Sequence, residues 1–237
     1  KHLSWTELKR AAFSMDNRPI SRASFGLNHL AGGFDPYGYK LVNLAIHIIN
    51  GILIFFFSGL LIKVLQCRDD GLSEYPTTVF AGLVALAWTL HPINLTNVLY
   101  VVQRMNSLSA LFTLSGMLMY VYGRMALDAS ARKGIILMLA SILVFTPLAF
   151  FSKENGLLLP GFLFLIELTI FQFRTKSDSS RTFIIAFYTI VLAIPMILAA
   201  MYIFSHPGRF HEGYSSRYFT LKERLLNETR FIWMYVK

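Results

Sequence analysis

Basic side chains occur at three points where the sequence passes between apolar stretches. Arg18 precedes the first apolar stretch, Arg104 precedes the third, and Lys153 lies between the fourth and the fifth. Arginine binds a phosphate group through two parallel hydrogen bonds, and lysine binds it as a point charge. Little acid accompanies them besides Glu154. We therefore predict that Arg18, Arg104 and Lys153 form a cationic site for the phosphate of a lipid-linked substrate.

Three more polar residues border the same apolar stretches. His91 ends the second stretch, Asn106 opens the third, and Glu154 follows Lys153. Each borders a helix end that we expect at one membrane face, so we predict that all three shape the same pocket. The alternative for Lys153 is that it only pairs with Glu154 or caps a helix. A charged loop residue is usually just solvated, so each of these residues taken alone is a weak indication of a site.

Four polar residues stand inside apolar stretches, where ionisable and amide side chains are costly. Asn43, His47 and Asn50 are spaced i, i+4, i+7 and therefore share one face of a helix. Hydrogen bonding between helices is the favoured interpretation for this face, and a functional site is the alternative. Glu167 lies near the middle of the fifth stretch. Three interpretations are open, namely a buried protonated acid, a partner for a basic residue, and part of a functional site. A role in packing is slightly favoured over a functional site.

The composition excludes a water-soluble protein. Of 237 residues, 55% are hydrophobic and only 15% are charged, and the mean hydropathy is +0.52. A soluble domain has about a quarter charged residues. The single Cys67 excludes a disulfide scaffold. We expect membrane lipids, and no nucleic acid, as partners.

Six stretches approach the length of about 20 apolar residues that a membrane-spanning helix needs. They predict an all-α, polytopic helical membrane protein, in which the second stretch either crosses or re-enters the membrane. The stretches are Tyr39 to Leu65, Thr78 to Leu90, Asn106 to Tyr122, Gly134 to Phe151, Gly156 to Phe173, and Thr182 to Phe204.

The loop charges predict an orientation. Eight lysine and arginine residues fall in the short loops on one side of the six stretches and two on the other. The positive-inside rule assigns the richer side to the cytoplasm. We expect residues 1–38 and 205–237 to be non-cytoplasmic loops around a membrane region at 39–204. Capping boxes at Ser4–Glu7 and Thr220–Glu223 predict helices in both tails, the second amphipathic.

Four ordered segments resemble the transmembrane-and-TPR O-mannosyltransferase-like proteins. They are residues 18–28 with 38–47 (RPISRASFGLN, GYKLVNLAIH), 91–104 (HPINLTNVLYVVQR), 152–160 (SKENGLLLP) and 219–235 (FTLKERLLNETRFIWMY). The resemblance implies a GT-C type glycosyltransferase of the endoplasmic reticulum or a bacterial inner membrane. It implies transfer of a sugar from a polyprenyl phosphate to a protein or glycan acceptor, a Ser/Thr hydroxyl above all, on the luminal or periplasmic side. Eukaryotic members also carry TPR repeats.

The sequence departs from the family pattern at two points. The early acidic pair is absent, and Asn106 stands where relatives often carry an acid. The chain begins with Lys1, and its last residues resemble the start of a further apolar span. We therefore expect a longer protein whose catalytic acids lie upstream. No residue here is assigned as the catalytic base. No His-rich or Cys/His metal set is visible, and a divalent ion is not excluded.

Two other functions compete with the glycosyltransferase. A transporter or lipid flippase would use the face of Asn43, His47 and Asn50 together with Glu167, although no matching halves with broken helices are found. An inactive membrane scaffold would keep the fold without the acidic pair.

Overall fold

The computed structural model describes residues 18–68, 76–206 and 220–236. Within these ranges the regular elements are α, 3-10 and π helices, and no strand occurs there. The predicted all-α class is therefore confirmed.

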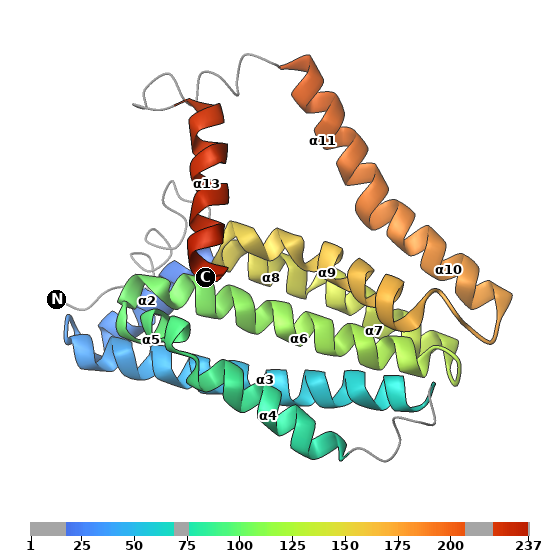
Figure 1. The fold of residues 1–237 in the computed structure, drawn as a ribbon, viewed down its shortest axis with the longest axis horizontal. Helices are drawn as coiled ribbons and strands as arrows, with labels where there is room; N and C mark the ends of the chain where they lie inside the picture. Colours follow the sequence, from blue (N-terminus) through green and yellow to red (C-terminus); the bar gives the residue numbers. More distant parts are fainter. Residues whose placement is uncertain (1–17, 69–75, 207–219, 237) are drawn as a thin grey trace. The chain divides into compact units, whose positions relative to one another are not determined.

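Figure 1 shows the helices in their order along the chain. In chain order they are α2 Pro19–Gly32, α3 Pro36–Gln66, α4 Thr77–Leu90, η2 Pro92–Asn94, α5 Leu95–Leu99, η3 Val101–Gln103, α6 Arg104–Ala126, α7 Ala131–Leu143, α8 Phe145–Ser152, η4 Glu154–Leu158, α9 Leu159–Ile166, η5 Glu167–Phe171, α10 Asp178–Tyr188, η6 Thr189–Ala193, α11 Ile194–Ser205 and α13 Leu221–Val236. Prolines at or next to the first position start α2, α3 and α9, where their missing N–H removes no helical hydrogen bond.

Four helical runs in the described residues are long and apolar enough to cross a membrane. They are Pro36–Gln66, Ala131–Ser152, Glu154–Phe171 and Asp178–Ser205. A fifth exists if Thr77–Leu90 and Pro92–Leu99, bent by 51°, form one broken span or a re-entrant loop. The remaining predicted span, Asn106 to Tyr122, lies within α6, which is 23 residues long. Helix α6 as a whole includes serine, asparagine and arginine residues, and it is not among these apolar runs. The predicted six spans therefore become four or five.

Helix α6 lies at the centre of the first compact unit, which extends to Ile185. It packs against α3, α7, α8 and α9, while α4 packs on α3 (Figure 1). The first residues of α3 and α6 and the last residues of α4 and α8 therefore meet at one end, which we call the Arg104 end. The opposite end, where α6 is followed by α7, we call the Arg124 end.

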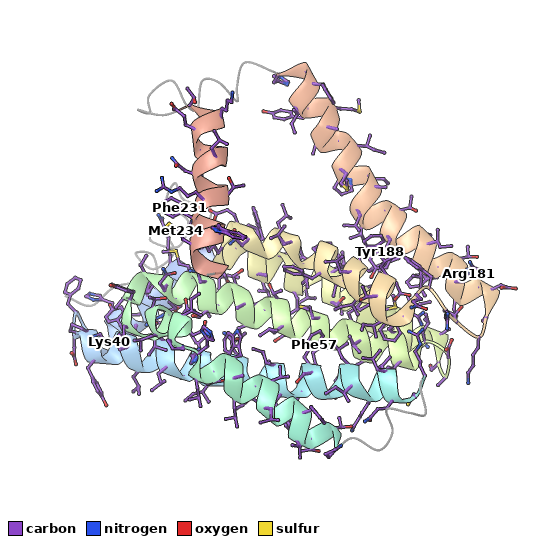
Figure 2. The ribbon with its side chains drawn as sticks, in the orientation of Figure 1. Lys40, Phe57, Arg181, Tyr188, Phe231 and Met234 are labelled. Carbon is purple, nitrogen blue, oxygen red and sulfur yellow. The ribbon has the colours of Figure 1, made fainter. Side chains whose placement is uncertain are left out.

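Polarity in this unit is reversed relative to a soluble protein. Large apolar side chains such as Ile48, Ile52 and Phe56 of α3 are exposed, while Asn43 and Asn50 of the same helix are buried. Figure 2 shows side chains projecting outward along the helices. A surface so rich in apolar groups fits lipid, because lipid tails solvate it and water does not. The structure thus supports the predicted multi-pass membrane protein.

The Arg124 end is held by a buried ion pair. Arg124 Nε lies 2.9 Å from Glu167 Oε2, and the two side chains are 2% and 0% exposed. Tyr120 donates its hydroxyl to the same carboxylate at 2.7 Å. Of the interpretations open for Glu167, the structure selects the partner for a basic residue. Arg104 and Arg124 were both counted as loop charges, but each is a buried residue of α6. Removing them takes one charge from the count on each side of the membrane, so the imbalance between the two sides stays.

The second compact unit begins at Ala186 and contains η6, α11 and α13. Helix α13 starts with the predicted capping box. The Thr220 amide donates to Glu223 Oε2 at 2.7 Å, and the Glu223 amide donates to Thr220 Oγ1 at 3.3 Å. The Thr220 amide and the Thr220 hydroxyl both donate to the Glu223 carboxylate, and these two bonds lower the pKa of Glu223. The box predicted at Ser4–Glu7 lies outside the described residues, and the proposed division into loops and membrane region stays a prediction.

We predict that Gly156→Ala destabilises the close packing of η4 on α8. A Cβ at this position would overlap the backbone carbonyl of Ala149, which cannot rotate away as a side chain does. Overpacking of this kind costs about 1–3 kcal/mol. Thermal unfolding in detergent should therefore show a lower Tm for Gly156→Ala.

The matched control is Gly161→Ala in α9, where a Cβ would meet nothing within 4 Å. Because alanine favours a helix over glycine, its Tm should equal or exceed that of the wild type. Equal Tm values for both variants would contradict the close packing of η4 on α8.

Candidate functional site

Arg104 is enclosed at the first turn of α6. Its Nε donates to Asn43 Oδ1 at 2.8 Å. One terminal nitrogen donates to the carbonyl and hydroxyl oxygens of Ser24, and the other donates to Asn28 Oδ1 and the Tyr39 carbonyl. A guanidinium has five N–H donors, and here each has an acceptor. Arg104 is 0% exposed, so it fastens α2 and α3 to α6.

Two aromatic rings complete this enclosure. The Arg104 guanidinium carbon lies 4.8 Å from the ring centroid of Phe25 and 5.4 Å from that of Tyr39. Ring faces attract a cation, more strongly once water is excluded. Within the described part of the chain no carboxylate pairs with Arg104, so oxygen dipoles and rings stabilise its charge.

The polar face of α3 is used for contacts between helices, as the favoured interpretation predicted. Asn43 Nδ2 donates to the carbonyls of Val98 and Tyr100 at 3.4 and 3.2 Å. His47 Nε2 lies 2.9 Å from the Thr89 carbonyl of α4. Its ring stacks on Trp88 with the centroids 5.0 Å apart. These bonds join α3 to α4 and to the segment before α6.

Asn50 extends the same face by one more turn. Its Nδ2 donates to the Ser107 carbonyl of α6 at 3.0 Å. Next to it Gly51 packs so closely on Thr89 that a Cβ would collide with the threonine hydroxyl. The polar face therefore sets how closely α4 and α6 approach α3.

A second set of bonds attaches α2 to the turn after α8. Arg18 Nε donates to both Glu154 carboxylate oxygens, at 2.9 and 3.1 Å. Ser21, fully buried, donates its hydroxyl to the Ser152 carbonyl at 2.8 Å. The charge of Arg18 is thus compensated by Glu154, and both carboxylate oxygens of Glu154 accept hydrogen bonds from Arg18.

Lys153 instead reaches α6. Its Nζ donates to Asn106 Oδ1, and Asn106 Nδ2 donates to Gln103 Oε1. Lys153 and Asn106 line a cavity of about 470 Å³. The cavity continues between apolar or weakly polar side chains of α3, α4, α6 and the η4–α9 segment, among them Ile54, Trp88, Thr113, Met117, Leu158 and Phe162. We call this cavity the Lys153 groove.

The predicted site residues meet at the Arg104 end but form two separate groups. Arg104 has no donor left for a phosphate in this structure, and Arg18 is paired with Glu154. Lys153 and Asn106 face the groove. His91 stands at the end of α4, where its Nδ1 accepts from the Ile93 amide at 3.2 Å, and it does not line the groove.

The sequence reasoning missed the residues that hold Arg104. Ser24, Asn28 and Tyr39 lie in the segments 18–28 and 38–47 that had already been singled out. A buried arginine needs several oxygen acceptors, and the serine and asparagine in those segments were the available signal. Trp88, which borders the groove and stacks on His47, carried no polar signal and was not found.

We predict that Arg104→Lys destabilises the protein although the charge is kept. Lysine has three donors on one nitrogen and cannot reach acceptors on α2 and α3 together. Hydrogen bonds to a charged group contribute about 1.5–3 kcal/mol each, so the loss should exceed about 3 kcal/mol and lower the Tm clearly. Arg132→Lys, at an exposed position, is the control and should leave the Tm unchanged. A wild-type Tm for Arg104→Lys would show that the enclosure does not hold the helices.

Comparison with known proteins finds relatives of one kind. The chain is 30% identical over 146 residues to the human protein O-mannosyl-transferase TMTC4, covering 61% of this chain and 20% of that protein. It is 35% identical over 104 residues to human protein O-mannosyl-transferase TMTC2, covering 44% of this chain and 11% of that protein. The Drosophila melanogaster protein O-mannosyl-transferase Tmtc3 is 28% identical over 126 residues, with 48% and 13% covered.

The likeness has defined limits. No family model matches the sequence, and no solved structure matches it. The chain spans a fifth or less of the length of these three relatives. Over that part, the predicted resemblance is confirmed: the chain is similar to the protein O-mannosyl-transferases of the TMTC family.

Proposed function

We propose that this chain is the donor-binding part of a membrane glycosyltransferase that uses a polyprenyl-phosphate sugar. The observation that carries the proposal is the Lys153 groove, which places one cation at the head of a cavity with apolar walls. A polyprenyl phosphate has the matching form, an anionic head on a long apolar chain.

The neighbouring contacts favour Lys153 as the residue that meets the phosphate. Glu154, the nearest acid in sequence, binds Arg18 through both carboxylate oxygens. The alternative that Lys153 only neutralises Glu154 is therefore not supported. The hydrogen-bond partner of Lys153 is the neutral amide of Asn106, so the positive charge is held in place without a hydrogen bond to a carboxylate within the described residues.

The walls of the groove fit a hydrocarbon chain. Met117, Leu158 and Phe162 contribute apolar surface along it, and Thr113 and Ser109 are its small polar side chains. Burying apolar surface contributes about 25 cal/mol per Å². The prenyl chain would thus supply most of the affinity, while Lys153 would orient the phosphate.

The similar proteins are named as protein O-mannosyl-transferases, which supports transfer to a protein acceptor. Sugar transfer needs a carboxylate to deprotonate the acceptor hydroxyl and a cation to stabilise the leaving phosphate. Lys153 would provide the cation at the non-cytoplasmic face of the endoplasmic reticulum or bacterial inner membrane. No residue of this chain is assigned as that base.

The transporter alternative gains no support from the polar face on which it depended. Asn43, His47 and Asn50 bond to neighbouring helices, and Glu167 is paired with Arg124.

We predict that Lys153→Ala weakens donor binding by about tenfold to over a hundredfold, because one charge-assisted hydrogen bond contributes roughly 1.5–3 kcal/mol. Lys153→Arg should recover part of the affinity. Binding is measured on purified full-length protein with a polyprenyl-phosphate sugar, and the Tm of each variant establishes that it is folded.

The control is Arg132→Ala, an exposed basic residue at the Arg124 end. It should bind the donor as the wild type does. Equal donor affinity in the wild type and a folded Lys153→Ala variant would refute the site.

A further inference from the structure

The Arg124 end contains a second cationic cavity, separate from the Lys153 groove. Its volume is about 850 Å³, and Arg68, Arg174 and Lys176 line it. Its described lining includes one acidic residue, Asp128. One carboxylate oxygen of Asp128 accepts the Lys176 amide at 3.1 Å. The described lining therefore keeps an excess of positive charge.

Arg68 is held in position at the end of α3. It donates to the Ile170 carbonyl and, at 2.9 Å, to Gln172 Oε1. Two of the five guanidinium N–H groups are used in these bonds, so further donors stay available for a ligand. Asp69 and Asp70 follow Arg68 in the sequence but lie outside the described residues.

The turn that carries Arg174 and Lys176 is strained and firmly anchored. Gln172 and Phe173 both have left-handed backbone conformations, with φ of 53° and 56°. Such conformations in non-glycine residues are costly and persist only where the surroundings impose them. Here Arg124, buried against Glu167, donates to the Arg174 carbonyl at 2.6 Å and lies over the Phe171 ring. The buried ion pair thus fixes a turn that brings two cations to the cavity.

The remaining walls are largely apolar. Val64, Met125 and Phe171 line the same cavity as the three cations. It lies where the candidate spans Pro36–Gln66 and Glu154–Phe171 end, and the ends of a membrane-spanning helix lie near the lipid head groups. Basic pockets between membrane helices bind anionic lipid head groups.

We propose that this cavity binds the phosphate of an anionic phospholipid, with Arg68, Arg174 and Lys176 around the head group and the acyl chains against the apolar wall. The site is independent of the proposed function, because it lies at the opposite end of the bundle from Lys153. It gives the buried Arg124–Glu167 pair and the strained turn a role in ligand binding.

The test measures thermal stabilisation of the purified protein in a neutral detergent. Dioleoyl phosphatidic acid is titrated, with dioleoyl phosphatidylcholine and inorganic phosphate in parallel. We expect saturable stabilisation by phosphatidic acid alone. In the double variant Arg174→Gln/Lys176→Gln, the half-saturating concentration should rise about tenfold or more.

The matched control is Arg132→Gln/Lys133→Gln. Like the test variant it removes one arginine and one lysine charge near this end of the bundle, but neither residue lines the cavity. It should respond to phosphatidic acid as the wild type does. Should the Arg174/Lys176 double variant not fold, the single change Lys176→Glu at an exposed position replaces it. Equal responses in all variants, stabilisation by phosphatidylcholine as strong as by phosphatidic acid, or a response to inorganic phosphate alone would overturn the proposal.

Discussion

The burial of one arginine governs the arrangement of the Arg104 end. A guanidinium removed from water without a carboxylate is stable only if its donors find acceptors, and Arg104 finds five oxygen atoms on α2 and α3. These acceptors come from segments that lie 61 to 80 residues away in the chain. Satisfying the one side chain therefore fixes three helices at once. The turn that carries Lys153 joins this assembly through Arg18 and Ser21.

A similar device operates at the other end of α6. Arg124 and Glu167 are buried as an ion pair and connect α6 to the π-helical turn at Glu167–Phe171. Removing either partner would leave an isolated charge, which is far more costly than the pair. The central helix thus carries one buried arginine at each end, and each positions a different cationic cavity. This explains why α6 is less apolar than its neighbours.

The sequence predicted the parts of the structure that follow from local patterns. Apolar length gave helices close to Tyr39–Leu65 and Thr78–Leu90, and the spacing of Asn43, His47 and Asn50 predicted a shared face. The roles of the arginines were beyond its reach, because type and spacing are the same for an enclosed guanidinium and an open one. Arg104 was expected at a phosphate, and only its contacts with Ser24, Asn28 and Tyr39 reveal the enclosure. The partner of Glu167 lies 43 residues away, and no local pattern specifies that distance.

The claim that the Lys153 groove holds a polyprenyl chain is tested most directly by photo-crosslinking in the full-length protein. A benzophenone amino acid replaces Met117, which lines the groove, or Met119, which lies on the same helix and lines a different cavity. After illumination with a polyprenyl phosphate, mass spectrometry identifies the adduct. We expect an adduct of the polyprenyl phosphate at position 117, and an excess of the sugar-carrying donor should remove it. No adduct is expected at position 119. Equal capture at both positions, or capture at position 119 alone, would contradict the account.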